Sequence, residues 1–171
     1  MNLDFQQNIP ADFNNDARVW IYQASRLFLL NEALEIETML EDFVADWKSH
    51  GDVVTGYANL FFGQFIVIMA DETATGVSGC STDSSVRLIK AIQEKFKVAM
   101  FDRTTLAFII KDKLQLLPLN QLKYAVENNF INGDTLYFNN VVAHKKELLE
   151  KWIIPVKESW LKTKISNLVS H

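Results

Sequence analysis

The sequence predicts an α+β fold in which helices cover one face of an antiparallel sheet. Two observations lead to this prediction. The 171 residues are 49% hydrophobic, with 12 Phe and 4 Trp, which is the composition of a globular chain that can bury a core. β-branched and aromatic runs also alternate with segments whose apolar residues recur at helical spacing. Because no linker or repeat interrupts the chain, we expect an irregular polar arm over residues 1–16 and a single domain over residues 17–171.

The first predicted strand covers residues 18–22, which are β-branched or aromatic. A helix then runs from its cap, Asn31, to His50, with Gly51 as the residue beyond its end. The buried face of this helix is predicted from its apolar residues at helical spacing, which are Ile36, Leu40, Phe43, Val44 and Trp47.

The middle of the chain supplies two strands, a second helix and two further strands. Their predicted ranges are 53–62 and 64–70, about 83–96, then 98–101 and 106–110. The order up to this point is β-α-β-β-α-β, which is the ferredoxin-like split βαβ order. This order places two helices on one face of a single antiparallel sheet.

The last third of the chain predicts a C-terminal β/α extension. A hairpin around residues 111–113 returns through 114–117, and a strand covers 135–138. Between them, a short helix capped by Asn120 buries Leu122, Val126 and Phe130. Two helices follow at 145–154 and 156–169, on either side of Pro155, and Trp152 and Trp160 are expected to anchor them to the sheet.

The composition also indicates the cellular compartment of the protein. The chain does not open with a basic segment followed by an apolar core, and its longest apolar stretch, residues 60–70, is too short to cross a bilayer. The single cysteine, Cys80, has no partner for an internal disulfide, which is typical of a reducing compartment. We therefore expect a cytoplasmic protein with no membrane span.

The segment most informative about function leads into the second predicted helix. It follows an apolar strand and contains Ser78, Gly79, Cys80, Ser81, Thr82 and Asp83. A strand–loop–helix turn of this kind presents free backbone N–H groups at the positive end of the helix dipole, where an anion is favoured. We expect a binding domain with a small anionic ligand or partner at the loop 78–85, and Arg103 as a further candidate binding residue. The alternative is that these hydroxyls only cap the helix.

Cys80 has two interpretations. The helix dipole lowers the pKa of a nearby thiol, which suggests a thiol-dependent enzyme or redox sensor with His50, His144 or Arg103 as partner. A small buried residue where loop meets helix is the second interpretation. We assign no catalytic residue and favour a protein that is not an enzyme.

The charge distribution is uneven. Residues 1–85 hold 13 Asp/Glu and 3 Lys/Arg, whereas residues 86–171 hold 8 and 14. A basic C-terminal half suggests an interaction module that uses the C-terminal helices to bind protein or nucleic acid. Because these lysines are spread among glutamates, we favour complementary surfaces of one domain and do not expect nucleic acid as a partner.

Motifs for nucleotides, metals and cofactors are missing from the sequence. Gly51 and Gly56 have the glycine spacing of a P-loop, but Tyr57 and Ala58 stand where lysine and Ser/Thr are required. There is no Gly-x-Gly-x-x-Gly or Gly-x-Ser-x-Gly. The acidic segment 37–46 lacks the paired Glu-x-x-His motifs of a carboxylate-bridged centre, so we predict no metal and no cofactor.

Four phrases of the sequence resemble a small, uncharacterised bacterial family whose members often carry the label "ABC transporter ATPase". They are RVWIYQ at 18–23, SGCSTD at 78–83, FDR at 101–103 and TLYFNN at 135–140. The label implies nucleotide hydrolysis coupled to transport. Because the chain departs from that label by lacking a P-loop, the resemblance transfers no catalytic residue and no ATPase activity.

Overall fold

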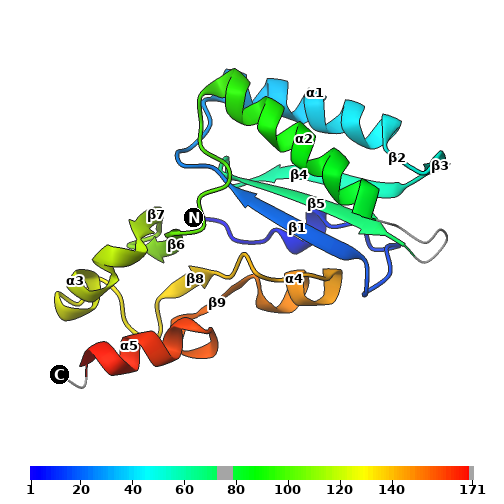
Figure 1. Cartoon of the computed structure of the whole chain (residues 1–171). Helices are drawn as coiled ribbons and strands as arrows, with labels where there is room; N and C mark the ends of the chain where they lie inside the picture. Colours follow the sequence, from blue (N-terminus) through cyan, green and yellow to red (C-terminus); the bar gives the residue numbers. More distant parts are fainter. Residues whose placement is uncertain (73–78, 170–171) are drawn as a thin grey trace. The chain divides into compact units, whose positions relative to one another are not determined.

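The computed structural model describes residues 1–72 and 79–169, with 79–81 and 169 described by their backbone alone. Helices and antiparallel sheets make up the chain (Figure 1), which confirms the predicted α+β class. The chain forms two compact units. The N-terminal unit contains residues 4–101 and 141–149, and the C-terminal unit contains residues 1–3, 102–140 and 150–171. The single domain over 17–171 stays a prediction.

The N-terminal unit is built on a three-stranded sheet of β1 (Arg18–Gln23), β4 (Thr55–Phe61) and β5 (Phe65–Asp71). The strand order is β1-β5-β4 and both pairings are antiparallel, so β1 and β4 run parallel on either side of β5. In the centre, Ile68 pairs with Trp20 and with Ala58. Every residue of β5 is buried, which explains why its sequence up to Asp71 is a continuous apolar run.

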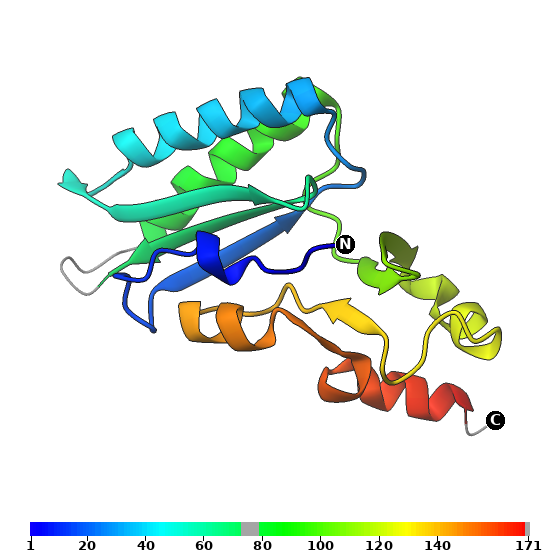
Figure 2. The ribbon, with the colours of Figure 1, turned by 180° about the vertical axis from the view of Figure 1, so that it is seen from behind.

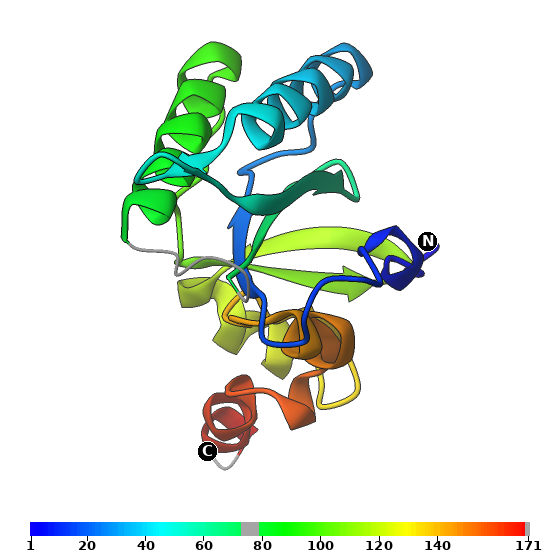
Figure 3. The same ribbon diagram turned by 90° about the vertical axis from the view of Figure 1, so that its right-hand side faces the viewer.

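Helices α1 (Leu30–Asp46) and α2 (Gly79–Phe96) cover one face of this sheet (Figures 1 and 3). The first turn of α1 is fixed by Glu32, whose carboxylate accepts the N–H of Leu29 at 2.8 Å. Side chains of both helices meet the sheet in one apolar core, whose fully buried members include Ile36, Leu40, Ile66, Ile68, Ile89 and Ile92.

The ferredoxin-like order is not confirmed, because its fourth strand is missing. Residues 98–101 form no strand, although Val98 and Met100 are buried as the apolar pattern predicts. Their backbone bonds go elsewhere: Ala99 exchanges hydrogen bonds with Ser25, and the N–H of Met100 donates to Gln93 Oε1. Beside β1, the N–H of Val19 instead donates to the carbonyl of Ala143 at 2.9 Å, so residues 143–144 line that edge.

The predicted end of the first helix is wrong by four residues. α1 stops at Asp46, and β2 (Lys48–Ser49) pairs with β3 (Asp52–Val53) in a small hairpin. His50 and Gly51 form its turn with φ values of +51° and +89°, the left-handed conformations of a type I′ turn. Gly51 therefore serves a hairpin and not a helix end.

The N-terminal arm lies against the face of the sheet opposite the helices (Figure 2). It contains one short 3-10 helix, η1 (Gln6–Asn8). Phe5 is buried against Phe61, and the hydroxyl of Tyr57 donates to the carbonyl of Asn8 at 2.6 Å. A second attachment comes from Lys145, the first residue of α4 (Lys145–Lys151), whose Nζ donates to the carbonyls of residues 11 and 13. The irregular arm is thus tied down at both ends.

The C-terminal unit contains a four-stranded antiparallel sheet in the order β7-β6-β8-β9. Its strands are β6 (Thr105–Ile110), β7 (Lys113–Pro118), β8 (Leu136–Phe138) and β9 (Ile153–Pro155). Lys111 and Asp112 form the β6–β7 turn with φ values of +50° and +58°. The predicted hairpin around residues 111–113 is confirmed.

The helical elements of this unit are η2 (Leu119–Gln121), α3 (Leu122–Glu127), η3 (Val156–Glu158) and α5 (Leu161–Val169). Its core joins Leu106 and Phe108 of β6 to Val126 of α3 and Leu161 of α5. Phe130, which was predicted to be buried, is 49% exposed. Of the two predicted anchors, Trp152 is fully buried, and Trp160 is 45% exposed but contacts the sheet, since its indole N–H donates to the Tyr137 hydroxyl of β8 at 3.1 Å.

The predicted helix over 145–154 is wrong in its last three residues. α4 ends at Lys151 because Asn139 takes up the last carbonyls, with its N–H donating to Trp152 and its side-chain amide to Lys151. The next residues form β9, in which Ile154 pairs with Tyr137 of β8. No helix within the described ranges is long and apolar enough to cross a membrane.

Candidate functional site

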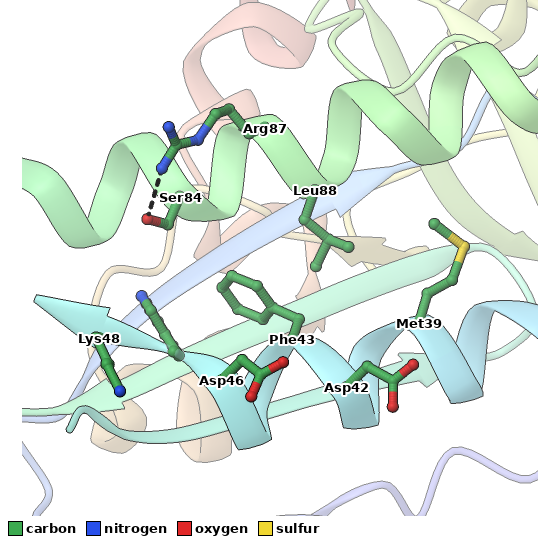
Figure 4. Close-up of a pocket in the computed structure, with 9 residues that line it drawn as sticks. Met39, Asp42, Phe43, Asp46, Lys48, Ser84, Arg87 and Leu88 are labelled. Atoms are coloured by element: carbon green, nitrogen blue, oxygen red, sulfur yellow. Dashed lines mark hydrogen bonds between the residues drawn. The ribbon is translucent and has the colours of Figure 1, made fainter.

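A groove of about 610 Å³ opens between the C-terminal half of α1 and the beginning of α2 in the N-terminal unit (Figure 4). Its apolar lining comes from Met39 and Phe43 of α1, from Trp47 directly after that helix, and from Leu88 of α2. These side chains point toward one another because both helices pack on the same face of the sheet. The groove is therefore an outward continuation of the helix–sheet core.

Trp47 is held from several sides. Its carbonyl accepts the N–H of Val54, and its ring lies 4.7 Å from the ring of Phe43 and 6.3 Å from that of Trp20, measured between centroids. Gly56 of β4 lies directly beneath it, where a Cβ atom would be 2.5 Å from the indole. The absence of a side chain at Gly56 is what lets the indole lie on the sheet.

The indole N–H of Trp47 is buried and has no hydrogen-bond partner among the described residues. The residue as a whole is only 2% exposed. A buried N–H of this kind costs about 1–3 kcal/mol relative to one that is paired, and most such groups have a partner. Trp47 thus has an unused donor, and the same residue lines the groove.

Charged and polar side chains form the rim of the groove. Asp42 and Asp46 extend from α1, Lys48 follows on β2, and Ser84 and Arg87 come from α2 (Figure 4). The Arg87 guanidinium donates to the hydroxyl of Ser84 at 3.2 Å. All four charged groups are exposed, and none of them forms an ion pair within the described part of the chain. The rim therefore offers two cations and two carboxylates above an apolar floor.

The sequence-predicted site lies at the beginning of α2, next to this groove. Ser78 falls outside the described residues, and Gly79, Cys80 and Ser81 are described only as the first residues of α2. The carbonyl of Thr82 accepts the hydroxyl of Ser85 at 2.7 Å, and Asp83 is exposed. Because α2 begins at Gly79 and not near Asp83, Ser84 and Ser85 lie beyond its first turn.

Arg103 belongs to the C-terminal unit, whereas Thr82 and Asp83 belong to the N-terminal unit. Beside it, Asp102 accepts hydrogen bonds from Thr104 and Thr105. These bonds, led by the one from the Thr104 hydroxyl, lower the pKa of Asp102. This carboxylate organises its own turn, and its geometry gives no reason to place a ligand there.

The structure places both histidines that were proposed as partners of Cys80. His50 forms the β2–β3 turn, and His144 lies beside β1. Since the side chain of Cys80 is outside the described residues, no observation favours the thiol-dependent alternative. In the described residues, no three His, Cys, Asp or Glu side chains gather as a metal site would require.

Sequence reasoning missed Trp47, Lys48 and Arg87 as members of a site. Trp47 fits the apolar stripe of α1, so the pattern predicts only core. The available signal was chemical: an indole placed in a core still needs an acceptor for its N–H. Comparison with protein-family models, with curated proteins and with solved structures gives no match, so the site is interpreted from its geometry alone.

Proposed function

We propose that this protein is a non-enzymatic binding domain that takes a small ligand with an anionic head and an apolar body in the groove between α1 and α2. The observation that carries the proposal is the buried, unpaired N–H of Trp47 in the lining of that groove. The resemblance to a bacterial family and the single cysteine support a place in the bacterial cytoplasm.

Two donor groups of the groove suit an anionic head group, the indole N–H of Trp47 and the guanidinium of Arg87. The Trp47 N–H lacks an acceptor, and the Arg87 guanidinium has donors beyond the one directed at Ser84. A carboxylate is the natural partner, because guanidinium groups bind carboxylates through two parallel hydrogen bonds. Met39, Phe43 and Leu88 would contact the apolar body of such a ligand.

The carboxylates of Asp42 and Asp46 limit the charge of the ligand. They share the rim with Arg87 and Lys48, so the four groups sum to zero charge. A nucleotide with several phosphates would bring more negative charge than these two cations offset. The proposal therefore favours a monocarboxylate over a polyphosphate, in agreement with the missing P-loop.

The direct test is to follow the indole N–H signals of the 4 Trp residues by NMR while adding N-acetylphenylalanine. The Trp47 signal, assigned by its loss in Trp47→Phe, is expected to move downfield as the N–H gains an acceptor. Phenylalaninamide serves as the control, because it has the same ring and a cation but no carboxylate. An equal response to both ligands, or no response to either, would contradict the proposal.

Variants of the rim test the same site by affinity. Arg87→Gln removes the guanidinium and is expected to weaken binding of N-acetylphenylalanine about tenfold or more, since hydrogen bonds to charged groups contribute about 1.5–3 kcal/mol. Lys90→Gln removes an exposed cation from the same helix outside the groove and should leave the affinity unchanged. Calorimetric titration of both variants measures the difference.

A further inference from the structure

The beginning of α1 carries leucines that are exposed to solvent. Leu27 and Leu29 precede the helix and are 56% and 62% exposed, while Leu30 and Leu34 lie on it and are 78% and 57% exposed. Leu30 and Leu34 are one turn apart, so they lie on the same face of α1. One exposed leucine is ordinary, but four between residues 27 and 34 are typical of an interaction surface.

Negative charge continues the same face toward the end of α1. The helix contains six Asp/Glu and no Lys/Arg. Glu32 and Glu35 have partners in Arg26 and Lys95. Glu37 and Glu41 are exposed, form no ion pair within the described residues, and follow Leu30 and Leu34 at helical spacing. The face is therefore apolar in its first half and acidic in its second.

The whole N-terminal unit has the same sign of charge. It holds 15 Asp/Glu and 9 Lys/Arg, against 6 and 8 in the C-terminal unit. The charge of the N-terminal unit attracts a basic partner and repels an acidic one before contact is made. The acidic half of the face and the negative charge of the whole unit thus both favour a basic partner.

We propose that the face of α1 from Leu30 to Glu41 is a docking surface for a basic amphipathic helix of another protein. Apolar side chains of that helix would cover Leu30 and Leu34, and its Lys or Arg one to two turns further along would meet Glu37 and Glu41. Pairing of amphipathic helices through anchors at helical spacing is an established recognition mode. Neither leucine lines the groove between α1 and α2, so this proposal does not depend on the proposed function.

The probe is a Leu/Lys amphipathic peptide of about 14 residues, roughly four helical turns. Its addition is expected to shift backbone amide signals of residues 27–41 and to bind less tightly as salt is raised. The double variants Leu30→Gln/Leu34→Gln and Glu37→Gln/Glu41→Gln should each weaken binding by about tenfold. Val141→Gln and Glu94→Gln change an exposed apolar and an exposed acidic residue outside this face. They are the controls for the leucine and glutamate variants and should leave the affinity unchanged.

Three results would overturn the proposal. The first is affinity that neither double variant lowers. The second is equal binding of a Leu/Glu peptide with the same apolar pattern, which would remove the role of charge. The third is self-association in sedimentation that Leu30→Gln/Leu34→Gln abolishes, because the occupant would then be a second copy. A dispersed amide spectrum with unshifted signals outside residues 27–41 shows that the leucine variant is folded, and this control holds whether or not the groove binds a ligand.

Discussion

Gly56 decides how closely the Trp47 ring approaches β4. The indole occupies the space that any larger side chain on this strand would need, with ring atoms 2.5 and 2.9 Å from the place of a Cβ. Real Cβ contacts are not this short, so the ring must move if the residue is changed. The shape of the groove floor therefore depends on one missing methyl group.

We predict that Gly56→Ala lowers the free energy of unfolding by about 1–3 kcal/mol, the usual cost of overpacking a core. Displacement of Trp47 should also change the Trp47 indole signal without any ligand. Gly133→Ala is the control, because a Cβ there would meet its nearest atom, in Lys157, at an ordinary 3.5 Å. Urea denaturation compares the two, and an equal effect of both substitutions would exclude steric contact with Trp47 as the cause.

Glu32 is the most strongly perturbed carboxyl group among the described residues. Both of its oxygens accept from the Arg26 guanidinium, at 2.8 and 2.9 Å, and it also accepts the N–H of Leu29. The hydrogen bonds from Arg26, then the one from Leu29, lower the pKa of Glu32 from its ordinary 4.5 to about 2. The start of α1 thus depends on an ionised side chain.

Because the folded-state pKa is the lower one, the contribution of Glu32 to stability is complete above pH 4.5 and is lost as the pH falls toward 2. We predict a carboxyl titration midpoint near pH 2 by NMR, which Arg26→Gln moves up toward 4.5. Arg87→Gln removes a cation from the same unit without touching Glu32 and should leave the midpoint in place. A midpoint near 4.5 in the unsubstituted protein would refute the role of Arg26.

At the scale of elements, β5 is the part of the N-terminal unit with the fewest exposed atoms. It is the central strand, and its residues from Phe65 to Ala70 have relative exposures of zero. A strand buried on both faces loses packing on every side when a side chain is shortened. Stability of this sheet should therefore be more sensitive to β5 than to either neighbour.

We predict that Ile68→Ala lowers the free energy of unfolding by about 2–5 kcal/mol, as buried large-to-small substitutions do. Val141→Ala, at a residue that is 67% exposed, should change it by no more than about 0.5 kcal/mol. Both changes in the free energy of unfolding are measured from the midpoints of urea denaturation, provided that the dependence of the free energy on urea concentration is unchanged. A loss at Ile68 as small as that at Val141 would mean that β5 is not a core strand.

Most elements were predictable because their residues combine the right periodicity with the right backbone preference. β1, β4, β5, the β6–β7 hairpin and the greater part of both long helices follow from such patterns. The predictions fail where backbone hydrogen bonds to other parts of the chain override the pattern of apolar residues. Residues 98–101 look like a strand, but Ser25 and Gln93 take up their N–H groups. Residues 153–155 continue a helical pattern, but β8 supplies an edge for them to pair with.

The candidate site was predictable only in part, for a related reason. The sequence predicts a ligand-binding site over residues 78–85, at the beginning of α2. Of these residues, Ser84 lines the groove. The sequence does not indicate that α1 packs beside α2 and brings Trp47 to Arg87, since residues forty positions apart share no local pattern. The sequence shows only that an indole placed in the core needs an acceptor. Whether that acceptor is present depends on how the chain packs.

At the scale of the whole molecule, neither compact unit is one continuous segment. Residues 141–149 return to the N-terminal unit after the chain has passed through residues 102–140. This returning segment bonds to Val19 at the edge of β1 and holds the arm through Lys145. The fold of the N-terminal unit therefore draws on chain that lies far beyond its last sheet strand.

We predict that a fragment of residues 1–101 is poorly folded or aggregates, because the edge of β1 is left unpaired and open to other chains. Addition of a peptide covering residues 141–151 should restore a dispersed amide spectrum, whereas a scrambled peptide should not. Sedimentation and NMR follow both properties. A fragment that is monomeric and fully dispersed on its own would contradict the structural role of the returning segment.

The amine of Lys145 is enclosed by the two main-chain oxygens that it binds, and the residue is only 5% exposed. Lys146, its neighbour in sequence, is open to solvent. An acylating reagent such as acetic anhydride should consequently label Lys146 first and reach Lys145 only in molecules whose first sixteen residues have come away. The ratio of the two labels within a single proteolytic fragment would report how often that detachment occurs.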